Sequence, residues 1–244
     1  LRCELPHHTT LPLFEKLVGR EPVSLVSLMD HSPGQRQFAN IEKYREYYQG
    51  KYSLSDAEMA RYEEEQLALA ARWSQPNRVR IAAMCRDRNI ALASHDDATH
   101  DHVLESHHLG SVIAEFPTTF EAAEASRKHG MNVLMGAPNI VRGGSHSGNV
   151  AASKLASLGL LDILSSDYYP ASLLDAAFRV ADDEGNRFTL PQAIRLVTKN
   201  PASALNLQDR GEIAEGKRAD LVLAHRRGEH VHIDHVWRQG KRVF

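Results

Sequence analysis

The sequence lacks several features that would place the protein in a specialised class. Two cysteines, Cys3 and Cys85, among 244 residues are too few for a disulfide framework, and this favours a reducing, cytoplasmic location. No apolar run approaches the roughly 18 residues that a membrane-spanning helix needs. Basic residues (29) nearly balance acidic ones (31), so the charge pattern predicts no nucleic-acid-binding patch. We therefore expect neither a membrane nor a nucleic acid as a partner.

The residues that are abundant indicate a globular enzyme or binding protein. A hydrophobic content of 42% and a charged content of 25% are enough for one substantial core, with room for a small second domain. Fourteen histidines occur, and they cluster along the chain. Clustered histidine is typical of metal or phosphate chemistry, although solvated polar loops give the same composition.

Short apolar runs alternate with helical segments through most of the chain. A capping box at Ser55 predicts a helix to about Trp73, and a second helix is expected from about Asn77 to Arg88. Strands that alternate with helices predict a parallel sheet with helices outside. The strand-like runs are 1–3, 24–29, 90–93, 111–114, 132–135 and 161–164. From Gly211 onward apolar and polar residues alternate, which predicts a small β-structure in the tail.

Four strand-like runs are followed by a potential metal ligand. These residues are Glu4, His31, His95 and Asp167. In a βα-barrel the C-terminal ends of the strands surround one mouth, so residues far apart in sequence converge there. Two imidazoles with carboxylates suit zinc, manganese, iron or nickel. A single histidine at a strand end is more often a hydrogen-bonded structural residue, and the prediction depends on the repetition.

Two acids and several histidines near His95 have less definite roles. Asp96 and Asp97 follow His95 directly, and one of them could orient an imidazole or cap a helix. The polar stretch after them could form a lid-like loop or a solvated surface. Its histidines are His100, His102, His107 and His108.

A glycine-rich loop is the second candidate site. It contains Arg142, Gly143, Gly144, Ser145 and His146. Glycines allow backbone N–H groups to face a ligand, the N-terminus of a following helix favours an anion, and Arg142 can add a charge-assisted hydrogen bond. The pattern favours phosphate binding, with a flexible connection between strand and helix as the alternative.

Several motifs together resemble the diphosphatases of phosphonate breakdown within the amidohydrolase superfamily. The resemblance spans the chain, and the tail pattern at 198–202 and 211–222 is common to amidohydrolases in general. The narrower motifs are Ala93-Ser94-His95-Asp96-Asp97, Ala114-Glu115-Phe116-Pro117-Thr118-Thr119, Gly143-Gly144-Ser145-His146-Ser147-Gly148-Asn149 and Ser165-Ser166-Asp167-Tyr168-Tyr169-Pro170.

The resemblance implies an α/β fold, a (β/α)8 TIM-like barrel with a small C-terminal β-sandwich part. Residues 1–205 would form the barrel portion and residues 206–244 the sandwich portion. Counting back from Asp167 on the last strand gives about six of the eight strands. The superfamily's His-x-His pair on the first strand is not found at the start of the chain, so we expect a chain that lacks two βα units. His230-Val231-His232 fits that pattern but lies in the tail.

The resemblance also implies an activity. Glu4, His31, His95 and Asp167 would bind one or two divalent ions, zinc first among them, and Asp167 would also act as the base. The substrate would be a phosphorylated sugar, alpha-D-ribose 1-methylphosphonate 5-triphosphate, hydrolysed to the 5-phosphate and diphosphate. A second copy of the chain and proteins of the carbon–phosphorus lyase pathway would be its protein partners. The alternatives are another amidohydrolase activity, on a cyclic amide or N-acyl substrate, and a non-catalytic scaffold subunit.

Overall fold

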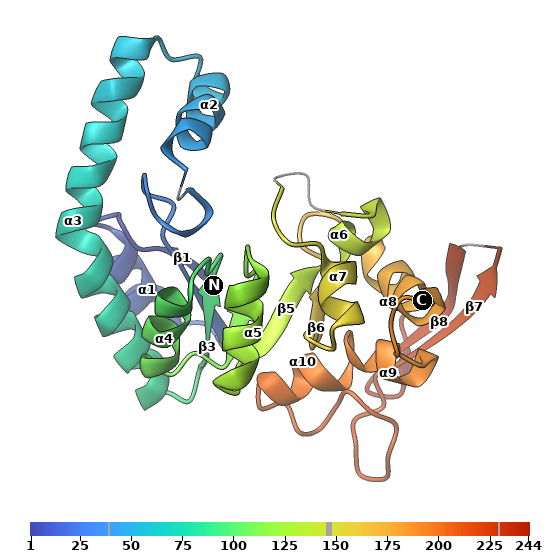
Figure 1. Ribbon diagram of the computed structural model, residues 1–244. Coiled ribbons are helices and arrows are strands. Elements are labelled where there is room, and N and C mark those ends of the chain that lie inside the picture. The colour runs from blue at the N-terminus through green and yellow to red at the C-terminus, as the bar shows by residue number, and fades with distance from the viewer. Residues whose placement is uncertain (39, 145–147, 229) are drawn as a thin grey trace. The chain divides into compact units, whose positions relative to one another are not determined.

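The computed structural model describes residues 1–38, 40–144, 148–228 and 230–244. The chain divides into two compact units, Leu1–Met131 and Asn132–Phe244, and Figure 1 shows the elements of both. Among the described residues, no helix has the length and apolar character that a membrane span requires.

The first unit is built around four parallel strands in the order of the sequence. Their register places Glu4 beside Met29, Leu28 beside Ser94, and His95 beside Glu115. All five residues of the third strand are buried, as expected for a parallel sheet that is covered on both faces. The strands are β1 (Arg2–Glu4), β2 (Leu25–Met29), β3 (Ala91–His95) and β4 (Ile113–Glu115).

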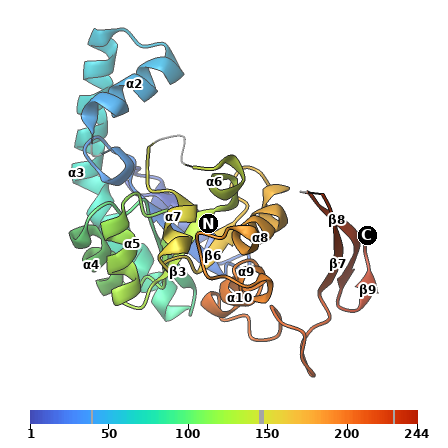
Figure 2. The same ribbon diagram turned by 45° about the vertical axis from the view of Figure 1, so that its right-hand side comes forward.

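Helices connect these strands and cover them. The core beneath them includes Leu5, Phe14, Val26 and Ile81. Figures 1 and 2 both show α2 beside the N-terminal half of α3, at a distance from the strands of this unit. The helices are α1 (Thr10–Val18), η1 (Arg36–Phe38), α2 (Ile41–Tyr52), α3 (Asp56–Asp87), α4 (His100–His108) and α5 (Phe120–Lys128).

Helix α3 corrects the prediction of two separate helices. It continues through Pro76, where the sequence suggested a break. Proline removes one backbone hydrogen bond and crowds the preceding turn, which disfavours a helix interior. The segment beyond Pro76 buries Ile81, Ala82 and Cys85 against the strands. This burial offsets the local cost, because hydrophobic packing contributes more than a single hydrogen bond.

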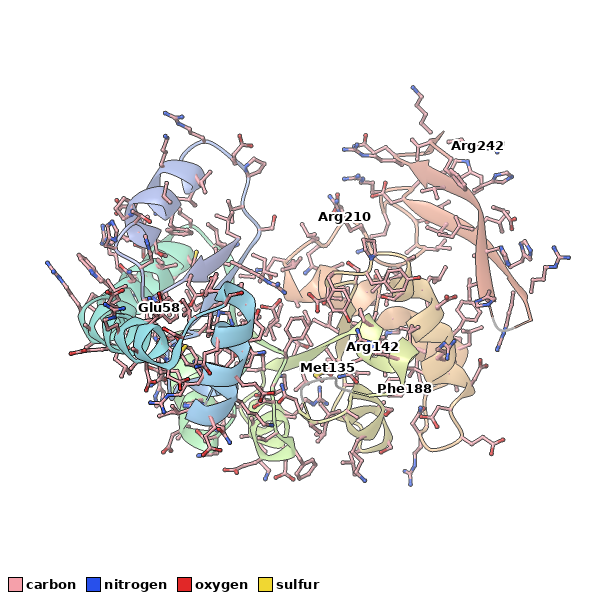
Figure 3. The ribbon with its side chains drawn as sticks, turned by 90° about the horizontal axis from the view of Figure 1, so that it is seen from above. Glu58, Met135, Arg142, Phe188, Arg210 and Arg242 are labelled. Atoms are coloured by element: carbon pink, nitrogen blue, oxygen red, sulfur yellow. The ribbon has the colours of Figure 1, made fainter. Side chains whose placement is uncertain are left out.

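The second unit contains two further parallel strands and a separate antiparallel sheet. β5 (Asn132–Gly136) pairs with β6 (Ile163–Ser165), with Met135 beside Leu164. The tail forms the antiparallel strands β7 (Leu221–Arg227), β8 (His230–Arg238) and β9 (Lys241–Arg242), and Figure 3 labels Arg242 on this sheet. The helices are α6 (Ala137–Arg142), α7 (Ala152–Ser157), α8 (Ser172–Asp182), α9 (Leu190–Arg195) and α10 (Lys199–Ala204).

The six parallel strands correspond to the six predicted strand-like runs. The antiparallel strands lie within 206–244, but no strand forms at 211–213, where the alternating pattern began. The stretch from His100 to His108 is a helix and not a loop. Thr99 caps this helix at its N-terminus. Val103 is buried, so the polar stretch includes an apolar side chain that packs into the interior.

Candidate metal centre

Three potential ligands meet at the ends of two adjacent strands. His95 is the last residue of β3, Asp96 follows it, and His31 lies two residues beyond the end of β2. The Nε2 atoms of His31 and His95 lie 3.7 Å and 3.4 Å from Oδ2 of Asp96. The ligand atoms of the three residues all lie within 4.8 Å of one another. The parallel register of β2 and β3 produces this convergence, because it brings both strand ends to one edge of the sheet.

Each histidine is held from behind by a carboxylate on the neighbouring strand. Oε2 of Glu4 lies 2.7 Å from Nδ1 of His31, and Oε2 of Glu115 lies 2.7 Å from Nδ1 of His95. An ionised carboxylate only accepts hydrogen bonds, so each Nδ1 carries the hydrogen. The Nε2 atoms are thereby directed toward Asp96. A carboxylate behind an imidazole is the usual arrangement that orients a metal-binding histidine.

The two supporting carboxylates have further contacts. Glu4 also accepts a hydrogen bond from the backbone N–H of His31 at 3.0 Å. Glu115 accepts hydrogen bonds from the hydroxyl of Ser27 and from Nη2 of Arg2, the latter at 3.0 Å. The side chain of Glu115 is 10% exposed, whereas that of Glu4 is 41% exposed. Glu115 is therefore the more tightly enclosed of the two.

The electrostatics of the centre follow from these contacts. Burial by itself would lower the pKa of His31, but hydrogen bonds to Asp96 and Glu4 raise that pKa to about 9. Burial would raise the pKa of Glu115, but the bonds from His95 and Ser27 lower that pKa to about 2. The pKa of Glu4 is also lowered, with burial opposed by the hydrogen bonds to His31. The carboxylates are therefore ionised at neutral pH, and a metal ion would compete with a proton at His31.

The backbone at Asp96 adopts a left-handed conformation, with φ of 56°. Such a conformation costs a non-glycine residue free energy, and it persists where surrounding contacts over-determine it. The N–H of Asp96 donates to the carbonyl of Glu115 at 2.9 Å, and the N–H of Thr118 donates to the carbonyl of Asp97 at 2.9 Å. These bonds join the turn after β3 to the turn after β4 and hold the carboxylate of Asp96 near the two imidazoles.

The donor set and its spacing fit a divalent metal ion. Nitrogen and oxygen ligands lie about 2.0–2.2 Å from zinc, so ligand atoms around one ion lie within a few ångströms of each other. Two imidazoles and a carboxylate also suit manganese, iron and nickel. Within the described ranges of the chain, this is the one group of three or more such side chains with converging ligand atoms.

The other predicted site residues lie in the second unit. Asp167 follows β6, is exposed, and has a left-handed backbone with φ of 47°. A Cβ added at Gly136 would lie 3.7 Å from Oδ2 of Asp167, so the carboxylate lies beside the end of β5. Glycine at that position leaves the space next to the carboxylate open.

The predicted phosphate-binding loop begins at the C-terminal end of a short helix and not directly after a strand. Arg142 is the last residue of α6, and Figure 3 labels its exposed side chain. Its guanidinium lies 5.6 Å from the ring centroid of Tyr168. Gly143 and Gly144 follow with φ of 84° and 158°. Ser145 and His146 lie outside the described residues.

The sequence interpretation missed Glu115 and assigned Asp96 only a supporting role or a helix cap. Both residues could have been found by the rule that identified Glu4 and His95, because Glu115 ends β4 and Asp96 follows β3. Conversely, Glu4 was predicted as a ligand, and the structure places its carboxylate behind the ring of His31. The metal-binding roles of Glu4, His31, His95 and Asp167 remain predictions.

Comparisons with known proteins agree with this architecture. Residues 26–244 match the model of the amidohydrolase family. The chain is 88% identical over 244 residues to the alpha-D-ribose 1-methylphosphonate 5-triphosphate diphosphatase of Escherichia coli (strain K12), covering all of this chain and 65% of that protein. It is 34% identical over 110 residues to the adenine deaminase of Ligilactobacillus salivarius (strain UCC118), covering 43% of this chain and 18% of that protein.

A solved structure shows the same fold. The crystal structure of an uncharacterized protein matches with a TM-score of 0.52 and 20% identity, over 68% of this chain and 48% of that one. Together with the family match, this likeness confirms the predicted fold class.

Proposed function

The chain belongs to the amidohydrolase family, and from this premise we propose that it carries the hydrolytic site of a metal-dependent diphosphatase. The substrate is alpha-D-ribose 1-methylphosphonate 5-triphosphate, and the products are the 5-phosphate and diphosphate. The choice of substrate rests on the 88% identity to the diphosphatase of Escherichia coli. The chain spans 65% of the length of that relative.

Family membership and the group of His31, His95 and Asp96 support the use of a divalent metal. In the proposed site these three side chains hold the ion, and zinc suits them best, with manganese, iron and nickel as alternatives. Glu4 and Glu115 fix the rings from behind. We also propose that a second ion binds, with Glu4 or Asp167 among its ligands.

A bound divalent ion would lower the pKa of the attacking water and offset the negative charge of the triphosphate. Asp167 accepts the proton of the attacking water as general base. The water oxygen bonds to phosphorus, and the anhydride bond between the first and second phosphates breaks, so that diphosphate leaves. Arg142 and the loop residues Gly143, Gly144, Ser145 and His146 bind the phosphates. The exposed guanidinium of Arg142 and the glycine backbone support this role.

The test is an assay of diphosphate release by the full-length protein, with metal, after chelation, and after metal is restored. We expect release that is lost with chelation and regained with zinc or manganese. The same preparations are offered a cyclic amide. Hydrolysis of the amide without diphosphate release would favour the other amidohydrolase activity. A folded, metal-free protein that hydrolyses neither substrate would favour the scaffold subunit.

Two further parts of the proposal concern the surroundings of the protein. Association with a second copy of the chain, or with proteins of the carbon–phosphorus lyase pathway, is tested by gel filtration of the full-length protein alone and with those proteins. A cytoplasmic location is tested by cell fractionation.

A further inference from the structure

Five buried or half-buried charges form an alternating chain beside the candidate metal centre. Arg78 lies 3.3 Å from Asp30, and both arginines contact Oε2 of Glu105, Arg36 at 2.9 Å and Arg78 at 3.3 Å. Arg36 also forms an ion pair with Asp97. The order of charges is therefore Asp30, Arg78, Glu105, Arg36, Asp97. We call these five residues the charge chain.

The ends of the charge chain lie next to two candidate ligands. Asp30 immediately precedes His31, and Asp97 immediately follows Asp96. The chain thus links the residue before one ligand to the residue after another, across the ends of β2 and β3. Of its middle members, Arg78 comes from α3, Glu105 from α4 and Arg36 from η1, all in the same unit.

Burial makes these contacts strong and makes their loss costly. The side chains of Arg36 and Asp97 are 2% and 1% exposed, and Glu105 is 36% exposed. A buried charge that loses its partner destabilises the structure far more than an exposed one. Burial and then the proximity of Arg78 lower the pKa of Arg36 to about 10, so the guanidinium is charged at neutral pH. The negative charge of Asp96 is among those that raise the pKa of Arg36.

The turn that carries Asp96 needs such a support. Its left-handed backbone is held by hydrogen bonds to the turn after β4. The side chain of Asp97 adds an ion pair with Arg36 and a contact with Ser106, whose hydroxyl lies 3.5 Å from Oδ1 of Asp97. Asp30 is held in the same way by Arg78 and by the backbone N–H of Ser32 at 3.3 Å. None of the five residues belongs to the converging ligand group, so their effect on a metal ion must act through its ligands.

We propose that the charge chain is a positioning device that sets the distance between His31 and Asp96, and that Glu105 is the residue that couples its two halves. This inference rests on the proposed metal centre and names residues that the proposed function does not use. Metal affinity depends on how well the ligands are pre-organised, and residues that support ligands typically contribute about 10–100-fold.

The test is the Glu105→Gln variant of the full-length protein, which removes the shared charge without changing either strand end. We expect zinc affinity, measured by competition with a chromophoric chelator, to fall about 10–100-fold. Glu105→Asp keeps the charge but withdraws the carboxylate by one methylene, and we expect a smaller loss of affinity. The melting temperature of the zinc-free protein is measured alongside.

Glu63→Gln is the matched control. Glu63 forms an ion pair with Arg45 at 2.6 Å, and neither residue belongs to the converging ligand group or to the charge chain. We expect this control to keep the zinc affinity of the unaltered protein. Zinc affinity that is unchanged in both Glu105 variants would overturn the inference. It would also be overturned if Glu105→Gln fails to fold, or if Glu63→Gln loses as much affinity, since the charges would then serve the fold alone. Zinc binding by the unaltered protein without diphosphate release would contradict the proposed substrate and leave this inference standing.

Discussion

The two units carry their candidate site residues in opposite environments. In the first unit His95, Asp96 and Glu115 are buried and joined by short contacts. In the second unit Asp167 and Arg142 are exposed and lie at the ends of a strand and a short helix. A metal ion needs ligands that are fixed before it arrives, whereas residues that contact a substrate are often placed on exposed loop ends. The difference agrees with the proposal that the buried residues of the first unit bind the metal ion and that the exposed residues of the second unit contact the substrate.

The largest expected effect separates these two roles. Asp167→Asn in the full-length protein is expected to lower kcat for diphosphate release by about 10²–10⁴-fold, because the amide cannot accept the proton of the attacking water. The circular dichroism spectrum and the ion held by His31, His95 and Asp96 should stay as they are in the unaltered protein. Unchanged turnover would remove Asp167 from the mechanism, and a loss of bound metal would move it into the metal site.

The next effect concerns the first unit alone. Glu115→Gln is expected to lower zinc affinity by about 10–100-fold, because Nδ1 of His95 loses its carboxylate partner. Glu4→Gln is the paired variant, and we expect a smaller loss because Glu4 is half-exposed and its backbone contact can be made by an amide oxygen as well. Competition with a chromophoric chelator measures both. Equal losses would show that enclosure does not decide the contribution of these carboxylates.

Much of the fold could be predicted because most of the parallel strands contain a short apolar run. The runs at 90–93 and 132–135 correspond to β3 and β5, and the cap at Ser55 marks the start of α3. The end of that helix could not be read in the same way. Pro76 is a local signal against a helix, and the burial of Ile81 and its neighbours, which outweighs it, depends on residues far away in sequence.

The candidate site could be predicted only in part, for a similar reason. Strand ends identified His31 and His95, since their positions follow from the parallel order of the strands. The roles of Glu4 and Asp96 depend on where each side chain points, and the sequence pattern does not contain that information. The charge chain could not be predicted either, because Arg78 lies 48 positions from Asp30 along the sequence and contacts it only when α3 packs on the strands.

Gly211 is a tightly packed point of the second unit, and a substitution there tests whether exposed site residues imply loose packing of the backbone around them. A Cβ at Gly211 would lie 2.8 Å from Cβ of Ala202 and 3.0 Å from the backbone of Lys199, at a φ of 93°. Gly211→Ala is expected to lower the free energy of unfolding by about 1–3 kcal/mol. Gly216→Ala, with φ of 76° and nothing within 4 Å, should cost less. Denaturant unfolding measures both, and equal costs would mean that the loop can move aside.

The smallest effect concerns the exposed part of the first unit. Ser55 caps α3 through a reciprocal pair of hydrogen bonds with Glu58, which Figure 3 labels near the start of that helix. Ser55→Ala is expected to cost about 1 kcal/mol, as is typical for a lost cap. Because α2 and the start of α3 lie apart from the strands (Figure 2), the loss should appear as faster hydrogen exchange in the first turns of α3.

Zinc affinity and the exchange of β3 should stay unchanged in this variant. Glu58→Gln is the companion, since it keeps a side-chain oxygen for the N–H of Ser55 and removes only the charge that favours a helix N-terminus. We expect a smaller cost for Glu58→Gln than for Ser55→Ala. Faster hydrogen exchange in β3 would mean that α2 and the start of α3 unfold together with the metal centre. The start of α3 and the metal centre would then belong to one cooperative unit, and the stability of the buried site would depend on the N-terminal turns of α3.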